Sequence, residues 1–225
     1  MLEVTSKEDM GRKKFLEKYE AAFESLNDDN EELMKVARQE LPSYLEEVLE
    51  ADSKKLYSQA NFDLEMSQLT SEQFPPENFD LLLQVIQDSR FLKSRHSWGL
   101  LSVFEHDGEK LNDVQKTRLL GTLSEIYDLF EHWIPCFFIS ELVGENFPAE
   151  NSFAFFQRFT NSQKEIVRTF VPHGFEHAIM SSTSQELTVR IWDALLLLGQ
   201  DQSRQVRGEV QESLSRLENQ GFKRP

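Results

Sequence analysis

Residues 195–217 read LLLLGQDQSRQVRGEVQESLSRL, and this stretch decides the fold. Its spacing predicts one helix over 185–199 and a second over 203–218, joined by the short connection Asp201-Gln202-Ser203. A connection this short forces the two helices to pack antiparallel, because neither has room to swing away from the other.

The same two-helix unit is predicted three more times upstream, over 77–87 and 91–105, 112–129 and 131–144, and 151–160 and 162–180. The second helix of each pair carries a comparable segment, as in SRHSWGLLSVF from Ser94. The second residue of each segment is an arginine or a histidine, namely Arg95, His132, Arg168 and Arg207. Successive members of this set are 37, 36 and 39 residues apart. Near-constant spacing is typical of stacked helix hairpins, each of which shelters its neighbour's apolar face. The alternative is four amphipathic helices in an ordinary bundle, and the spacing favours the stack.

The turn at Asp201, followed by Val-Arg at the start of the second helix, resembles a HEAT repeat. In that family the turn Asp and the helix Arg form a ladder that ties successive turns together, and Asp201 with Arg207 matches this arrangement. Asp88 with Arg95 and Asn161 with Arg168 match it loosely. The second repeat departs from it, with His132 in the Arg place and no Asp expected in the turn. The resemblance covers 77–218 and implies a right-handed superhelix with a binding face.

Strand signals are nearly absent, so the fold class is predicted to be all-α. We expect an α-α superhelix of stacked antiparallel helix pairs, HEAT-like, with an N-terminal helical pair. The expected organisation is a helical pair or cap over 1–60, an irregular connection over 61–76, four helix pairs over 77–218 and a tail over 219–225.

The chain is acidic, with 39 Asp and Glu against 24 Lys and Arg and a formal net charge of −15. Most of the excess lies early, with 18 acidic and 9 basic residues over 1–75 but 8 and 9 over 151–225. This balance argues against nucleic-acid binding, which needs a basic face, and permits a basic protein as partner. The alternative is that the acidic charge simply keeps the protein soluble. The absence of a long apolar run argues against a membrane span, and the single cysteine fits a reducing compartment, so a cytoplasmic location is expected.

The motif His173-Gly-Phe-Glu176-His177 has the H-x-x-E-H order of inverted zinc peptidases. On a helix His173 and His177 lie one turn apart, as two zinc ligands require, and Glu176 would act on bound water. A third ligand is normally expected well downstream, yet only 48 residues follow His177, and Pro172 and Gly174 weaken the helix. We therefore predict a kinked helix with partly exposed imidazoles, and neither metal nor cofactor.

Two further groups carry candidate chemistry. Cys136 lies in an apolar run, which predicts a buried structural thiol, although His132 one turn earlier leaves a Cys–His pairing open. The stretch FPAENSFAFFQRF, residues 147–159, concentrates phenylalanines that favour a core over an aromatic docking surface.

We predict a non-catalytic protein-binding module with a helical-repeat surface, of the kind that neutralises a basic protein as an immunity protein or inhibitor does. The candidate binding residues are an acidic loop and an Arg ridge, namely Glu105, Asp107, Glu109, Asp113, Arg95, Arg168 and Arg207. Two enzymatic alternatives stay open. One is a DNA-interacting enzyme similar to alkylpurine DNA glycosylases, which are also helical-repeat proteins, if the Arg ridge faces one groove. The other is a zinc hydrolase that uses His173, Glu176 and His177.

Overall fold

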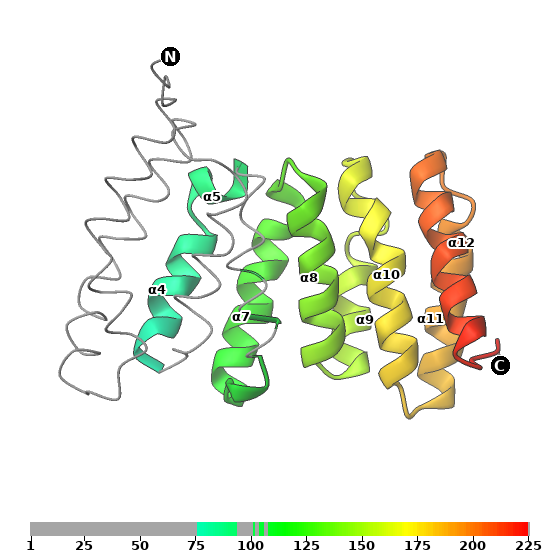
Figure 1. The fold of residues 1–225 in the computed structure, drawn as a ribbon, viewed down its shortest axis with the longest axis horizontal. Coiled ribbons are helices and arrows are strands. Elements are labelled where there is room, and N and C mark those ends of the chain that lie inside the picture. The colour runs from blue at the N-terminus through cyan, green and yellow to red at the C-terminus, as the bar shows by residue number, and fades with distance from the viewer. Residues whose placement is uncertain (1–75, 94–100, 102–103, 106–107, 225) are drawn as a thin grey trace, which may run out of the picture. The chain divides into compact units, whose positions relative to one another are not determined.

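The computed structural model describes residues 76–93, 101, 104–105 and 108–224, and all regular structure in these residues is helical (Figure 1). The all-α prediction is therefore confirmed for this part of the chain. The chain divides into two compact units, Met1–Val103 and Phe104–Pro225. The predicted N-terminal pair over 1–60 and the connection over 61–76 lie almost wholly outside the described residues.

In the first unit, helix α4 spans Pro76–Ile86 and helix α5 spans Ser89–Lys93. The turn between them is held by Asp88, whose carboxylate accepts hydrogen bonds from the Arg90 backbone N–H at 2.8 Å and from the Arg90 guanidinium at 2.8 Å. Asp88 thus caps the start of α5 and forms an ion pair with Arg90, two residues further along the chain. Arg95, its loosely expected partner, lies outside the described residues.

The second unit contains three successive helix pairs whose limits agree with the predicted ones to within a few residues. Its elements are η1 (Gly108–Lys110), α7 (Asp113–Ile126), η2 (Tyr127–Leu129), α8 (Trp133–Asn146), α9 (Ala149–Gln157), α10 (Glu165–Ser181), α11 (Gln185–Leu198) and α12 (Arg204–Asn219).

Local caps fix where several of these helices begin. Asn112 and Gln115 form a capping box at the start of α7, with the Asn112 side chain accepting from the Gln115 N–H at 2.9 Å. Ser184 and Ser203 cap α11 and α12 in the same way, each accepting from backbone N–H groups of the first turn. These polar residues satisfy donors that would otherwise have no partner, so the helix starts are readable from sequence.

Helix α10 is the centre of this unit. It packs against α8, α9, α11 and α12, and its residues 171–176 are all buried. In Figure 1, α8, α10 and α12 lie side by side in one layer, with α9 and α11 behind them. The second helices of successive pairs therefore form one face of the unit.

Pro172 and Gly174 do not end α10, which runs through both to Ser181. Gly174 instead admits a close contact, because a Cβ at this position would lie 2.2 Å from Cε2 of Phe156. The expectation of partly exposed imidazoles was wrong for His173, which is buried.

The phenylalanine-rich stretch lies in the core, as predicted. Tyr127 packs edge-on against Phe159 at 4.9 Å between ring centroids and against Phe156 at 6.3 Å, which joins η2 to α9. Five phenylalanines of this stretch are buried, namely Phe147, Phe153, Phe155, Phe156 and Phe159.

The turns within successive helix pairs are tied together in a row. The Lys164 ammonium donates to the carbonyl of Phe130 at 3.1 Å, and the Ser162 hydroxyl donates to the carboxylate of Asp128. The expectation that the second repeat lacks a turn Asp was therefore wrong, because Asp128 fills that role from η2, slightly upstream of the predicted turn.

The next tie is an ion pair between Arg168 and Asp201 at 2.8 Å, with both side chains at most 10% exposed. The Arg168 guanidinium also donates to the carbonyl of Ser162 at 2.7 Å. Arg207 donates to the carbonyl of Asp201 at 2.7 Å and so fixes its own turn. Asp201 and Arg207 thus interact as predicted, but through the backbone carbonyl of Asp201. The Asp201 carboxylate instead binds Arg168, which belongs to the preceding helix pair.

We expect Asp201→Ala to lower the free energy of unfolding by about 3 to 5 kcal/mol, because it leaves the buried Arg168 guanidinium without its counter-ion. The control is Asp193→Ala, which breaks an ion pair with Arg224 whose two side chains are 58% and 62% exposed. That control should cost at most about 1 kcal/mol. Urea unfolding of both variants measures the difference, and equal effects would contradict a structural role for the buried pair.

The same pair should make stability fall in acid. The hydrogen bonds from Arg168 hold the pKa of Asp201 below its ordinary value. A group whose pKa is lower in the folded than in the unfolded chain stabilises the fold above its unfolded pKa and loses that effect as the pH falls through the folded pKa. The stability difference between the wild type and Asp201→Asn should therefore be full at neutral pH and shrink below about pH 4, as followed by urea unfolding at each pH.

Candidate functional site

Three potential metal ligands meet where α8 packs against α10. Glu141 of α8 and His173 and His177 of α10 each offer a ligand atom, and these atoms all lie within 4.8 Å of one another. Glu141 Oε1 is 2.5 Å from His173 Nε2, and Glu141 Oε2 is 3.2 Å from His177 Nε2. We call these three residues the His–Glu cluster.

Helix geometry and one glycine create this meeting. His173 and His177 are four residues apart and so lie on one face of α10, opposite Glu141. Gly144, one turn beyond Glu141, lies directly against His177, where a Cβ would come within 2.5 Å of the His177 Cβ. The missing side chain lets α8 and α10 approach closely enough for the carboxylate to reach both rings.

Glu176 lies on the far side of His173 from Glu141. Its carboxylate is 3.3 Å from His173 Nδ1 and accepts a bifurcated hydrogen bond from the Nε–H of Arg216 in α12, at 2.8 and 2.9 Å to its two oxygens. Arg216 in turn donates to Glu209 at 3.0 Å and to the Ser213 hydroxyl at 3.2 Å. The cluster therefore continues as a polar network across α10 into α12.

Opposing effects set the charges of this network. Burial lowers the pKa of His173, but hydrogen bonds to Glu141 and Glu176 outweigh burial and raise it to about 9. Burial raises the pKa of Glu141, yet the hydrogen bond from His173 and the nearby His177 ring hold it well below its usual range. Burial also raises the pKa of Glu176, and hydrogen bonds from His173 and Arg216 reverse the shift. At neutral pH His173 is thus an imidazolium that donates to a carboxylate from each ring nitrogen.

His177 is less well satisfied than His173. Its Nε2 atom is buried and has no hydrogen-bond partner, because the contact with Glu141 is close in distance but poorly aligned. Buried polar atoms without partners are rare in folded proteins and mark places where an ion or ligand belongs.

Aromatic side chains border the His–Glu cluster on the same face. The Phe137 ring stacks on His173 with 5.3 Å between centroids and 11° between planes. Phe137 also packs edge-on against Phe170, which stacks on Trp133 at 6.3 Å. Trp133 is 57% exposed, an unusual position for the largest apolar side chain. We call Trp133, Phe137 and Phe170 the aromatic patch.

The structure thus brings the two histidines of the H-x-x-E-H motif together as predicted, and the third potential ligand lies upstream, on α8. The sequence interpretation looked downstream, where only 48 residues remain, and missed Glu141. Glu176 does not lie where a hydrolase needs its base. Its oxygens are held by Arg216 and face Nδ1 of His173, whereas the potential metal ligand is Nε2.

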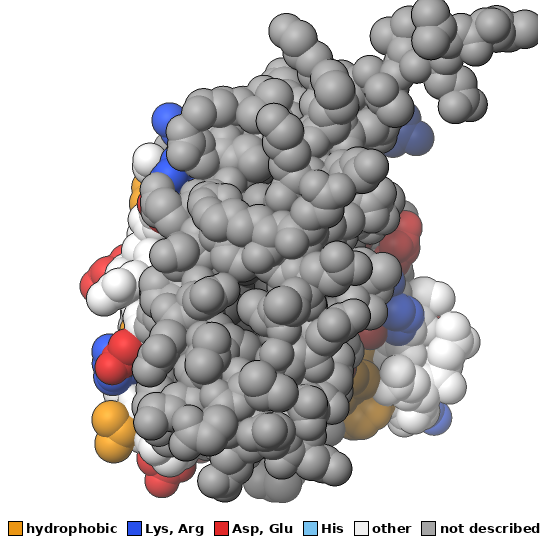
Figure 2. All heavy atoms as spheres, turned by 60° about the vertical axis from the view of Figure 1, so that its left-hand side comes forward, with side chains coloured by type: hydrophobic (Ala, Val, Ile, Leu, Met, Phe, Trp, Pro, Cys, Tyr) orange, Lys and Arg blue, Asp and Glu red, His pale blue; other side chains and the backbone are white. Residues whose placement is uncertain are grey.

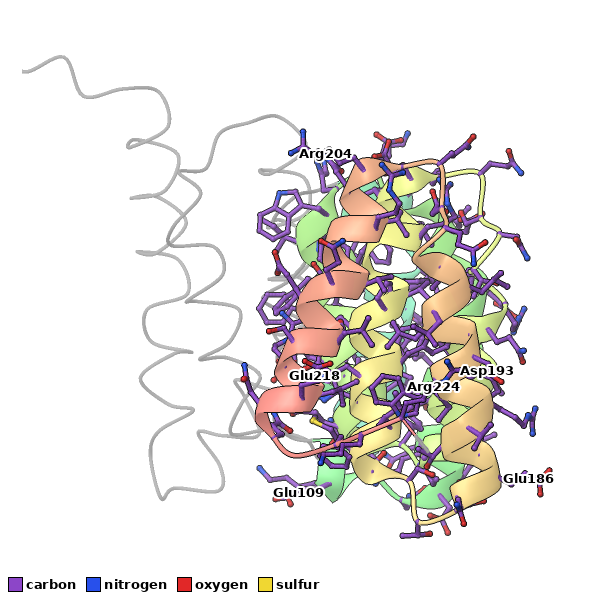
Figure 3. The ribbon with its side chains drawn as sticks, turned by 90° about the vertical axis from the view of Figure 1, so that its right-hand side faces the viewer. Glu109, Glu186, Asp193, Arg204, Glu218 and Arg224 are labelled. Atoms are coloured by element: carbon purple, nitrogen blue, oxygen red, sulfur yellow. The ribbon has the colours of Figure 1, made fainter. Side chains whose placement is uncertain are left out.

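The other predicted binding residues are not gathered into one site. Glu109 and Asp113 are exposed near the start of α7, and Figure 3 shows Glu109 projecting outward. Glu105 is half-buried, and its carbonyl accepts from Asn146 at 2.8 Å. Arg168 binds Asp201 and the carbonyl of Ser162, and Arg207 binds the carbonyl of Asp201, so both guanidinium groups are used within the turns between helices. Asp107 and Arg95 lie outside the described residues.

Cys136 is a buried free thiol, as predicted. Burial raises its pKa to about 12, so the thiol stays protonated at neutral pH. This protonation state argues against the Cys–His pairing with His132.

The close approach at Gly144 gives a matched test. We expect Gly144→Ala to lower the free energy of unfolding by about 1 to 3 kcal/mol, because the new methyl group would overlap His177 and force α8 and α10 apart. Gly121 of α7 is exposed, and a methyl group added there would have no atom within 4 Å. Gly121→Ala should instead stabilise the helix by about 0.5 to 1 kcal/mol, so the two variants should differ in sign when compared by thermal unfolding.

Among the described helices, none combines the length and the apolar character needed to cross a membrane. No family model, no curated protein and no solved structure matches this chain. Function is therefore inferred from the geometry and chemistry of the chain's own residues.

Proposed function

We propose that this chain is a non-catalytic protein-binding module, and that the face formed by α8, α10 and α12 binds the partner. The observation that carries the proposal is the exposed Trp133 of the aromatic patch. Trp133 begins α8 and stacks on Phe170 of α10, and these two helices lie with α12 in one layer (Figure 1).

Trp133 has the properties of a binding anchor. Its ring is partly ordered by stacking on Phe170, so little side-chain freedom remains to be lost when a partner covers it. Tryptophan is among the residues most enriched where a few side chains supply most of the binding energy of a protein interface. Burial of an exposed indole against a partner also removes a large apolar area from water.

The charge of the chain favours a basic partner. Residues 104–225 contain 18 acidic and 12 basic side chains, and the whole chain has a net charge of −15. Figure 2 shows acidic and basic side chains of the described residues interspersed along the margins of that view, so the attraction comes from the overall excess. Such an excess speeds association with a cationic protein, as an immunity or inhibitor role requires.

A HEAT-like superhelix is part of this proposal. The tie between Arg168 and Asp201 joins the turns of adjacent pairs, and the ties from Lys164 and Ser162 extend the row by one pair. Repeats joined in this way contact mainly their neighbours and leave a long face for binding.

The two enzymatic alternatives have less support. A glycosylase-like DNA interaction would use Arg168 and Arg207, but their guanidinium groups bond Asp201 and the turn carbonyls. A zinc hydrolase would use Glu176 as its base, but Arg216 holds that carboxylate away from the ligand side of His173.

We expect Trp133→Ala to weaken capture of the partner by about 10- to 100-fold, the loss typical of a central interface anchor. The control is Leu197→Ala, which removes an exposed apolar side chain from α11, outside the proposed face. Immobilised wild type, Trp133→Ala and Leu197→Ala would be compared for proteins captured from the source cells, followed by titration of the purified partner.

A basic protein captured by the wild type and Leu197→Ala but lost with Trp133→Ala would support the proposal. Its association rate should fall as salt rises, because salt screens the attraction between unlike net charges. Equal capture by all three proteins would contradict the assigned face, and a rate independent of salt would contradict the basic partner.

A further inference from the structure

We propose that Glu141, His173 and His177 form a binding site for a transition-metal ion, with Zn(II) as the best fit, that joins α8 to α10. This inference is independent of the protein-binding proposal, since it concerns a site between α8 and α10 and makes no claim about a protein partner. It also differs from a hydrolase site, because no base is assigned to it.

The donor set selects the class of metal. Two imidazole nitrogens and one carboxylate oxygen suit Zn(II) and its neighbours in the first transition row, whereas Ca(II) and Mg(II) favour all-oxygen sites. Three protein ligands leave a fourth position for water. The Glu141 side chain is 18% exposed, which leaves the cluster an edge open to solvent.

The spacing needs only a small adjustment. Ligand atoms at about 2.0 to 2.1 Å from a tetrahedral Zn(II) lie about 3.3 Å from one another. The contact of Glu141 Oε2 with His177 Nε2 has this length at 3.2 Å, and that of Glu141 Oε1 with His173 Nε2 must open from 2.5 Å. The widest separation among the three ligand atoms, which lie within 4.8 Å of one another, must close, and rotations of the Glu141 and histidine side chains would supply both changes.

The surroundings of His173 are those of a metal ligand. A ligating histidine almost always donates its second ring N–H to a carboxylate or carbonyl, which fixes the tautomer and orients the ring. His173 has Glu176 at 3.3 Å from Nδ1, and Arg216 anchors that carboxylate with a bifurcated hydrogen bond from its Nε–H. Phe137 stacked on the imidazole restrains it further. Nε2 is thereby turned toward Glu141 and His177.

The second observation that points to a ligand is Nε2 of His177. This atom is buried, faces the carboxylate and has no hydrogen-bond partner. Gly144 lets the His177 side chain pack directly against α8, on the helix that carries Glu141. A metal ion between Glu141 and His177 would satisfy the nitrogen, and it would replace the proton that His173 now shares with Glu141.

The test is titration of the full chain, first stripped of metal with a chelator, with Zn(II) in a calorimeter. We expect saturable binding of one ion per chain and a rise in melting temperature of about 5 °C at a hundredfold excess over Kd. Binding by Glu176→Gln should be weaker by about 10- to 100-fold, because this variant loosens only the orientation of His173. His177→Ala and Glu141→Gln, which remove ligands, should lose more than that.

His132→Ala is the matched control, since it removes a histidine at the start of α8 that lies outside the cluster, and its affinity should stay within about twofold of the wild type. Co(II) provides a second measurement, because its visible absorption reports coordination directly and can be recorded after circular dichroism shows each variant to be folded. Absence of one-to-one binding by the wild type, or equal binding by His177→Ala and His132→Ala, would overturn the proposal.

Discussion

The double-sided burial of α10 is the constraint on which the rest of the Phe104–Pro225 unit depends. A helix covered by neighbours on both sides gives its polar groups little contact with water, so most of them pair with groups on the neighbouring helices and turns. Arg168 finds Asp201, His173 finds Glu141, and Glu176 finds Arg216. The apolar positions hold the layers together, and these polar matches fix how far each helix slides along the next.

Much of this fold could be predicted from sequence because its signals are local. The spacing of apolar residues predicted each helix, and the caps at Ser184 and Ser203 that the structure shows are of a kind that a sequence can reveal. The turn ties were harder to read. Asp128 lies in a short 3₁₀ segment that the pattern merged into the preceding helix, so the row of ties looked interrupted where it continues.

The candidate site could be predicted only in part, for a related reason. His173 and His177 are neighbours on one helix, and a four-residue spacing reveals such a pair. Glu141 is 32 residues from His173 along the chain, and only the register of α8 against α10 brings them together. That register depends on Gly144, whose role is invisible until the His177 ring is seen against it. The exposure of Trp133 was equally hidden, since periodicity alone assigns a tryptophan to the core.

The buried thiol of Cys136 can serve as a probe of how often the helices around it separate. As the single cysteine, buried on α8 with its pKa raised to about 12, it is inert toward electrophiles while the helices stay packed. Once the helices separate, the thiol regains the reactivity of an ordinary cysteine, whose pKa is about 8.5. The rate at which a thiol-modifying dye labels the native protein therefore reports how often this part of the core opens, without any engineered probe.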